Sequence, residues 1–426
     1  MYTPIGDLKE KIGERVKVRG WVYRARESGG IAFVIVRDSS GIIQCTFKKG
    51  TVPDDVFERA SSVTIESSVI VSGTVVEDKR APGGIEIRGE DIEVVNLAEP
   101  FPITKDYSEE FLLDVRHLWI RSRKMTAVMK IRSTVFWALH DFFRKEGYYF
   151  VTSPTFITAA VEGGATLFEV NYFGKKAYLT QSAQFYLEAL IYSLEKVYTV
   201  APSFRAEKSK TRRHLTEFWH VEAEAAWYHN EDMMKFEERM IKHVVNEVLE
   251  RNQDELKFLG RDLSKLEITL PFERIKYEEA LEILNRKGFE LKWGDDLGAD
   301  EERALTEEFE NPFFITHFPR EKGFYHRPDP EEPRALLCHD LLAPEGYGEI
   351  IGGGERIYDK NELIERIKEM GLNPEDYDWY IDLRKYGSVP HSGFGLGADR
   401  FVMWIAGLEH IRDSTPFPRT ITRVKP

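Results

Sequence analysis

Short apolar-rich runs alternate with turn sequences over the first hundred residues. The runs are rich in valine and isoleucine, are separated by SGG, DSSG and APGG, and cover residues 16–26, 31–47, 67–78 and 83–95. Runs of this kind, bounded by glycine-containing turns, predict about five short β-strands. Such strands favour a small closed barrel of the oligonucleotide-binding type, the OB-fold β-barrel. A β-sandwich that serves only protein contacts is the alternative.

Beyond residue 110 the spacing of apolar residues becomes helical. A linker-like segment, EPFPITKDYSEE, covers residues 99–110, and apolar residues then recur at helical spacing at Val128, Ile131, Val135, Leu139 and Phe142. They predict an amphipathic helix over 123–146 that ends at Gly147. Further helical patterns lie near residues 183–194, 231–257, 277–287, 300–309 and 398–407. We therefore expect an α+β protein with a barrel domain at 1–100, a hinge or linker at 101–124 and a larger domain at 125–426.

Composition narrows the class of protein. The chain has 426 residues, of which 42% are hydrophobic and 31% charged, so it has enough apolar residues for a real core. No apolar run approaches eighteen residues and no signal-peptide stretch opens the chain, so we expect neither a membrane span nor secretion. The only cysteines, Cys45 and Cys338, exclude a disulfide framework and fit a reducing, cytoplasmic location.

The charge is unevenly distributed. The net charge of −13 argues against nonspecific binding of nucleic acid, but residues 1–50 contain 10 Lys and Arg against 5 Asp and Glu. A local basic patch can still hold a nucleic acid in an acidic protein.

The segment 202–227, PSFRAEKSKTRRHLTEFWHVEAEAAW, reads as strand, basic loop and strand. On the second strand Phe218, His220, Glu222 and Glu224 share one face, because side chains alternate with period two. A cationic loop beside a face that carries an aromatic ring and carboxylates suits a polyphosphate ligand with a purine ring. A solvated, charged hairpin is the alternative.

Two further segments carry candidate chemistry. In VPHSGFGLGADRF, glycines at alternate positions precede a helix with Arg400 in its first turn, which favours an anion more than a dinucleotide turn because no βαβ unit precedes it. In HDLLAPEGYGEIIGGGER, Asp340 and Glu349 could share Mg²⁺, although isolated acidic residues are as often only surface groups.

These segments resemble the three signature motifs of the class II aminoacyl-tRNA synthetases. The long helix followed by FVTSPTF resembles motif 1, FRAE with the Glu217–Phe218 turn resembles motif 2, and GFGLGADR resembles motif 3. VEGGATLF, QSAQFYLE, RRHLTEF and GEIIGGGER resemble the archaeal-type aspartyl and asparaginyl branch within the aspartyl, asparaginyl and lysyl subgroup. The resemblance covers nearly the whole chain.

The resemblance implies a fold and a reaction. The catalytic domain would be a six-stranded antiparallel sheet flanked by helices, and two copies would form a homodimer partly through motif 1. An amino acid and ATP would give an aminoacyl-adenylate, and the acyl group would then move to a tRNA. No side-chain nucleophile is needed, because catalysis is mostly positioning and charge neutralisation.

The resemblance also implies residue roles. Catalytic roles fall to Arg205, Glu349 and Arg400. The ATP site would contain Arg205, Glu207, Arg213, His214, Leu215, Phe218, Glu349, Gly397 and Arg400. The amino-acid site would contain Glu162, Ser182, Gln184, Leu187, Arg205, Glu222 and Arg356, with Glu162, Ser182 and Gln184 on the α-amino group. Mg²⁺ would lie on Asp340 and Glu349, although Gly352 stands where the aspartyl enzymes commonly have a serine.

Three of these residues predict which amino acid is activated. Aspartyl enzymes have a lysine, which pairs with the substrate β-carboxylate, where this chain has Leu187, and an aspartate where it has Glu222. Arg356 could donate to an amide oxygen while Glu222 accepts from the amide NH₂. A substrate carboxylate about 4 Å from Glu222 would instead cost roughly 4 kcal/mol at an effective dielectric of about 20, or about three decades in rate. We therefore expect L-asparagine and tRNA(Asn) as substrates.

In the barrel, the resemblance implies an anticodon-binding face. Phe33 would stack on an anticodon base, Gln44 would bond the central uridine, and Arg24 and Arg26 would contact phosphates. For Phe33, a place in the barrel core is the alternative. For the whole chain, the alternatives are aspartate as the substrate, an asparagine synthetase-like paralogue, which would need no barrel, and a catalytically silent RNA-binding paralogue.

Overall fold

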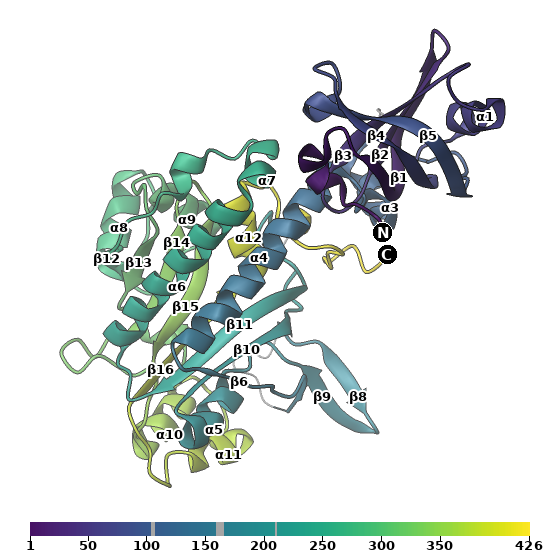
Figure 1. The fold of residues 1–426 in the computed structure, drawn as a ribbon. Helices are drawn as coiled ribbons and strands as arrows, with labels where there is room; N and C mark the ends of the chain where they lie inside the picture. Colours follow the sequence, from purple (N-terminus) through teal and green to yellow (C-terminus); the bar gives the residue numbers. More distant parts are fainter. Residues whose placement is uncertain (104–106, 159–165, 209–210) are drawn as a thin grey trace. The chain divides into compact units, whose positions relative to one another are not determined.

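The computed structural model describes all residues except 104–106, 159–165 and 209–210. It divides into two compact units, Met1–Leu113 and Asp114–Pro426, drawn in purple to blue and in blue through yellow in Figure 1. Arg116 in α3 (Arg116–Trp119) donates to the carbonyl oxygens of Arg412, Thr415 and Pro416 at 2.9 Å, which ties the start of the second unit to the end of the chain.

The first unit is a closed barrel of five strands in the order β1-β2-β3-β5-β4. The strands are β1 (Arg15–Ser28), β2 (Ile31–Arg37), β3 (Ile42–Lys48), β4 (Ser68–Glu77) and β5 (Ile85–Asn96), and α1 (Asp54–Ser62) lies between β3 and β4 in sequence. Burial alternates along β2 and β3, so Val34, Val36 and Cys45 fill the interior while their neighbours face outward. Closure of the sheet excludes the sandwich alternative and confirms the OB-fold barrel.

The second unit is built on an eight-stranded sheet in the order β12-β13-β14-β15-β16-β11-β10-β6. The strands are β6 (Tyr149–Phe150), β10 (Lys196–Phe204), β11 (Glu217–Ala226), β12 (Glu273–Lys276), β13 (Phe313–Thr316), β14 (Cys338–Ala343), β15 (Gly348–Glu355) and β16 (His391–Gly397). The strands from β13 to β10 pair antiparallel, which confirms the expected antiparallel sheet. A strand paired in parallel is added at each edge, β12 and β6.

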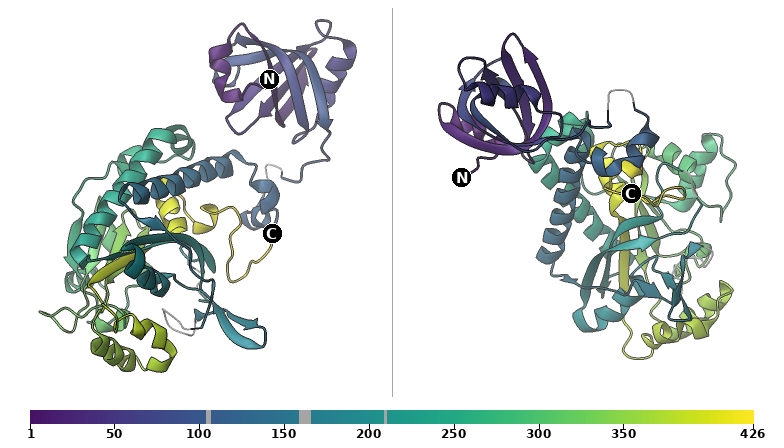
Figure 2. Two further views of the ribbon diagram at one scale, coloured as in Figure 1. Left: turned by 60° about the horizontal axis from the view of Figure 1, so that its bottom comes forward. Right: turned by 90° about the vertical axis from the view of Figure 1, so that its right-hand side faces the viewer.

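Helices cover one face of this sheet. The expected helix is α4 (Arg123–Lys145), and it packs with α6 (Asn230–Arg251) and α12 (Ala398–Ala406) on one apolar core (Figures 1 and 2). Val221 and Ala223 of β11 point into that core, so His220, Glu222 and Glu224 lie on the opposite face. Trp219, which shares the face of Val221 and Ala223 and would be expected in the core from that phase, is 39% exposed and packs edge-on against Phe136 at the margin of the core.

The remaining elements are a small sheet and several shorter helices. A small sheet contains β7 (Phe156–Ile157), β8 (Glu169–Tyr172) and β9 (Lys175–Leu179). Helices α5 (Gln184–Leu194), α10 (Lys360–Glu369) and α11 (Asp378–Asp382) gather near one end in Figure 1. The other helices are α2 (Glu109–Asp114), α7 (Gln253–Phe258), α8 (Tyr277–Arg286) and α9 (Ala299–Thr306). Among the described residues, no helix is long and apolar enough to span a bilayer.

Candidate active site

Two adjoining cavities lie over the polar face of the large sheet. The larger, about 550 Å³, is lined by residues of α5, β11, β14, β15 and the segment 321–326. The smaller, about 90 Å³, is lined by β11, the basic loop, the start of α12 and the C-terminal segment. They share four lining residues, Arg205, His220, Glu349 and Gly395. A ligand in one cavity therefore meets a ligand in the other at these residues.

The smaller cavity collects every residue that the sequence places around ATP. Its lining includes Arg205, Glu207, Arg213, His214, Leu215, Phe218, Glu349, Gly397 and Arg400. The guanidinium of Arg205 lies 5.3 Å from the centre of the Phe218 ring. The pKa of His214 is lowered by burial and by Arg400, so the imidazole is held toward its neutral form.

Two arginines of this cavity are held by the protein. Arg213 donates through Nη1 to Glu302 Oε2 at 2.6 Å and to the carbonyl oxygen of Tyr347 at 3.1 Å. Arg400 donates to the backbone carbonyl of Glu349 at 2.5 Å. Glu302, on α9, also accepts the backbone N–H of Glu349 at 2.8 Å. Glu302 was not expected from the sequence, because no local pattern links α9 to the basic loop.

The glycines of β16 make room for side chains of β11. A Cβ atom built on Gly393 would lie 2.1 Å from the Glu224 carboxyl carbon, and one on Gly395 would lie 2.5 Å from Nε2 of His220. The alternation seen in GFGLG is therefore that of a strand within the sheet, not that of a dinucleotide loop. These glycines keep the face open where Glu224 and His220 lie.

The larger cavity collects the residues expected around the amino acid. Ser182, Gln184, Leu187, Arg205, Glu222 and Arg356 line it. Glu222 accepts the backbone N–H of Ala183 at 2.7 Å and the hydroxyl of Ser182, so its carboxylate also orders the start of α5. Leu187 is fully buried. Glu162 lies outside the described residues.

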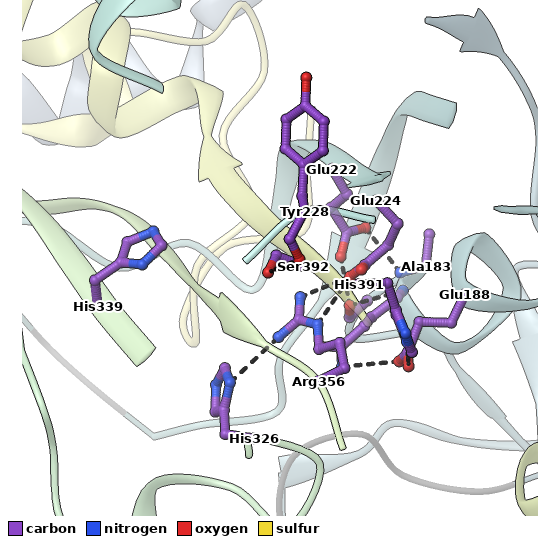
Figure 3. Close-up of polar contacts among 12 residues, drawn as sticks. Ala183, Glu188, Glu222, Glu224, Tyr228, His326, His339, Arg356, His391 and Ser392 are labelled. Carbon is purple, nitrogen blue, oxygen red and sulfur yellow. Dashed lines mark hydrogen bonds and ion pairs between the residues drawn. The ribbon is translucent and has the colours of Figure 1, made fainter. Parts of the chain in front are cut away.

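Glu224 is a residue of this cavity that the sequence analysis did not assign a role. Its Oε1 accepts from Nε and Nη2 of Arg356 at 3.0 and 2.6 Å, as Figure 3 shows. Burial raises the pKa of Glu224 to about 8, against the opposing effect of Arg356. Glu224 follows Glu222 by two positions on β11 and so lies on the same face, and this spacing could have identified it as a residue of the site.

His326 is the second such residue. Its Nδ1 lies 3.4 Å from Nη1 of Arg356, and burial together with Arg356 lowers the pKa of His326 well below its ordinary value. His326 is therefore neutral and accepts through Nδ1. It lies in GFYHRPDP, a segment with no periodic pattern, so no local pattern pointed to it.

The two carboxylates expected to hold Mg²⁺ converge above Gly352. A Cβ built on Gly352 would lie 3.3 Å from Asp340 Oδ1 and 3.2 Å from Glu349 Oε1. Asp340 Oδ1 is buried and has no hydrogen-bond partner among the described residues, while the other carboxylate oxygen pairs with Lys322. Burial raises the pKa of Asp340 to about 7 against the effect of Lys322. A buried, unused carboxylate oxygen opposite a second carboxylate suits a hard divalent cation.

The barrel carries its candidate residues on one outer surface. Phe33 is half-buried and lies outside the barrel core, which removes the core alternative. The Arg26 guanidinium lies 4.6 Å from the centre of its ring. Arg24 is exposed and is paired across the strands with Ile35, which is paired in turn with Gln44. Gln44 donates to Glu86 at 3.0 Å.

Comparison with known proteins identifies the family. Residues 108–421 match the class II tRNA synthetases (D, K and N), and residues 16–95 match the OB-fold nucleic acid binding domain. The chain belongs to this family of class II tRNA synthetases, which confirms the resemblance seen in its motifs.

Individual relatives are similar over the whole chain. An asparagine–tRNA ligase of Thermoplasma acidophilum is 58% identical over 420 residues and 98% of each chain. One of Thermococcus kodakarensis is 54% identical over 98% of this chain and 97% of its own. The crystal structure of the asparaginyl-tRNA synthetase of Pyrococcus horikoshii with asparaginyl-adenylate has a TM-score of 0.97 and 50% identity, with all of both chains covered.

Proposed function

We propose that this protein is an asparagine–tRNA ligase, which activates L-asparagine with ATP and transfers the asparaginyl group to the 3′ end of tRNA(Asn). The observation that carries the proposal is the pair of cavities that meet at Arg205. One has the lining expected for a nucleotide and the other the lining expected for an amino acid with an amide side chain. Relatives that are 48–58% identical over nearly the whole chain are asparagine–tRNA ligases.

In the first step the asparagine α-carboxylate attacks the α-phosphorus of ATP in line. A carboxylate O–P bond forms, the bond between the α-phosphorus and its bridging oxygen breaks, and pyrophosphate leaves with that oxygen. Arg205 lines both cavities, so one guanidinium can contact the carboxylate and the α-phosphate and neutralise the charge that develops between them. The enzyme contributes alignment and charge compensation rather than a nucleophile.

The nucleotide would be held by the lining of the smaller cavity. Phe218 would stack on the adenine and Glu207 would accept from its amino group. Arg213, His214 and Arg400 would contact the β- and γ-phosphates, while Leu215 and Gly397 would shape the walls. The ion pair of Arg213 with Glu302 and the hydrogen bond of Arg400 to the Glu349 carbonyl hold both guanidinium groups before ATP binds, which lowers the cost of ordering them.

Asp340 and Glu349 would hold Mg²⁺, with substrate phosphates and water as its other ligands. Bound there, the ion would neutralise charge on the phosphates during transfer. Lys322 pairs with Asp340 and, with Arg400, lowers the pKa of Glu349 against the effect of burial. Glu349 is thereby favoured in the ionised form that a cation requires, whereas Asp340, whose pKa burial raises to about 7, would release its proton as a cation binds.

Asparagine is favoured over aspartate by the charges around the side-chain end of the larger cavity. Arg356 donates to Glu224 and Lys322 pairs with Asp340, so both cations already have a carboxyl partner within the protein. Leu187 adds no charge. A substrate β-carboxylate would therefore meet Glu222 without the lysine that offsets its charge in the aspartyl enzymes, whereas an amide can accept from Arg356 and donate to Glu222.

The outer barrel surface with Phe33, Gln44, Arg24 and Arg26 would bind the anticodon. An aromatic ring beside two guanidinium groups suits stacked bases and their phosphates. We also propose a cytoplasmic homodimer built partly on α4. Trp137 on α4 is 73% exposed, and Tyr149 and Phe150 of β6 are each more than half exposed, which leaves apolar surface of the kind that a partner would bury.

ATP–pyrophosphate exchange tests the proposal. The purified protein would be assayed in Mg²⁺ without tRNA, with asparagine, aspartate and lysine in turn. Exchange with asparagine alone supports the proposal. Exchange with aspartate alone would keep the reaction and overturn the substrate, and no exchange would favour a silent RNA-binding paralogue.

A further inference from the structure

A buried carboxylate holds the side chain of Gln184. Gln184 opens α5 and lines the larger cavity, whereas Glu188, one turn further along the same helix, is fully buried and is absent from the lining. Gln184 Nε2 lies 3.2 Å from Glu188 Oε2. Because a carboxylate accepts and does not donate, this contact requires the amide NH₂ of Gln184 to face Glu188. The carbonyl oxygen of Gln184 is then turned away from Glu188.

Glu188 is held by three other donors from elements remote in sequence. Arg384 and His391 donate to Oε1 at 2.6 and 2.7 Å, and the Tyr380 hydroxyl donates to Oε2 at 2.7 Å. All of these side chains are buried, and Figure 3 shows His391 beside Glu188. Burial alone would raise the pKa of Glu188, but Arg384 and His391 lower it below its ordinary value. The carboxylate therefore stays ionised and accepts only.

This network ties α5 to two other elements of the domain. Tyr380 belongs to α11 and His391 begins β16, and Arg384 also donates through Nε to the carbonyl of Ile357 at 2.9 Å. A carboxylate that receives four donors has little rotational freedom. It can therefore impose one orientation on the Gln184 amide.

We propose that Glu188 is a positioning residue for the α-ammonium group of the amino-acid substrate. It holds the Gln184 amide so that the carbonyl oxygen, an acceptor, is presented to the cavity, where the substrate ammonium donates to it. The inference rests on the proposed function and deepens it, since it names the group that fixes one end of the substrate. Without Glu188, the amide can flip and offer its NH₂ to the ammonium, which is repulsive.

A double-mutant cycle separates this role from a merely structural one. The variants are Glu188→Gln, Gln184→Met and the pair, assayed by ATP–pyrophosphate exchange for the KM of asparagine and of ATP. We expect each single change to raise the asparagine KM by about tenfold, the loss of one charge-assisted contact, with the ATP KM unchanged. The double variant should match Gln184→Met alone, because Glu188 acts through Gln184.

A second readout isolates the ammonium group. Succinamate keeps the amide and the carboxylate of asparagine but lacks its α-amino group, so Glu188→Gln should leave its inhibition constant unchanged. Glu237→Gln is the matched control, because Glu237 is equally buried but pairs with His339. It should leave the asparagine KM unchanged. If Glu188→Gln does not fold, Glu188→Asp keeps the charge beside Arg384 and shortens the reach to Gln184, and the same pattern is expected.

Additive effects in the double variant, a parallel rise in the ATP KM, or weaker succinamate inhibition would each overturn the inference. Failure of the proposed function is distinguishable. If the wild-type protein activates aspartate instead, the cycle is run with aspartate, which carries the same α-ammonium. If no amino acid supports exchange, both the proposed function and this inference are wrong.

Discussion

Arg213 and Glu302 form an ion pair 2.6 Å long at the edge of the nucleotide cavity, although they lie 89 residues apart. Glu302 also accepts the backbone N–H of Glu349. One carboxylate therefore holds both Arg213, which is expected to contact the phosphates of ATP, and the backbone of β15, which carries the proposed metal ligand Glu349.

The first prediction concerns this ion pair. Glu302→Gln should raise the KM for ATP by about tenfold while the KM for asparagine stays within about twofold, because Arg213 loses the charged partner that orients it. Steady-state exchange at varied ATP would measure this. Asp300→Asn is the control, since Asp300 is an exposed carboxylate on the same helix. Equal effects of both changes would contradict the role of Glu302.

The second prediction concerns substrate choice. The double variant Leu187→Lys with Glu222→Asp should weaken asparagine activation by about tenfold or more, because a lysine ammonium would face the substrate amide and the shortened carboxylate would lose reach to its NH₂. Exchange with asparagine and with aspartate, compared as kcat/KM, measures the change. Unchanged asparagine kinetics would remove Leu187 and Glu222 from the specificity set.

The third prediction concerns the barrel. Phe33→Ala should raise the KM for tRNA(Asn) by about tenfold, since base–aromatic stacking contributes about 1–3 kcal/mol. Amino-acid activation without tRNA should not change. Val95→Ala removes an exposed apolar side chain on β5 of the same barrel and serves as the control. A tRNA KM that is equal in the wild type and Phe33→Ala would exclude stacking at this ring.

The fourth prediction concerns pH. Burial raises the pKa of Glu224 from 4.5 to about 8, so the folded protein keeps a proton there that the unfolded chain releases above about pH 4.5. The contribution of Glu224 to the free energy of unfolding therefore falls as pH rises from about 4.5 to about 8. The slope is up to about 1.4 kcal/mol per pH unit.

Glu224→Gln cannot release that proton, so its free energy of unfolding should depend less steeply on pH over the same range. Urea unfolding of both proteins at several pH values between 5 and 8, followed by tryptophan fluorescence, would compare the slopes. Parallel pH profiles would show that Glu224 titrates normally in the folded protein.

The fifth prediction concerns assembly. Trp137→Glu should convert a dimer into a monomer, because it would place a charge in the apolar surface of α4. Sedimentation equilibrium measures the mass directly. Tyr386→Glu is a matched control at a residue that is 77% exposed outside α4. A wild-type protein that sediments as a monomer would overturn the dimer at once.

The sequence was most informative where chemistry is local. Gly147 ends the long helix, and the residue phase on β11 correctly separates Glu222 and Glu224 from Val221 and Ala223. The residues expected around ATP and the described residues expected around the amino acid line the two cavities. Local motifs were sufficient for this because each set lies on a few strands of one sheet.

The sequence was least informative for the partners of those residues. Glu302 and Lys322 each come from a segment that contacts the site only after the chain has folded back across the sheet. A single charged residue in such a segment looks like any surface charge. The same holds for Arg384 and Tyr380, whose buried contacts with Glu188 depend on the packing of α11 against α5.

The shared wall of the two cavities has a consequence for inhibitor design. Because Arg205, His220, Glu349 and Gly395 line both cavities, the two cavities adjoin at these residues. A single molecule that joins an asparagine-like group to an adenosine through a stable link could occupy both cavities at once. Once one half is bound, the other half is present at its own cavity at a high effective concentration. Its affinity would then depend on both pockets together, so a change that weakens either one would weaken the whole molecule.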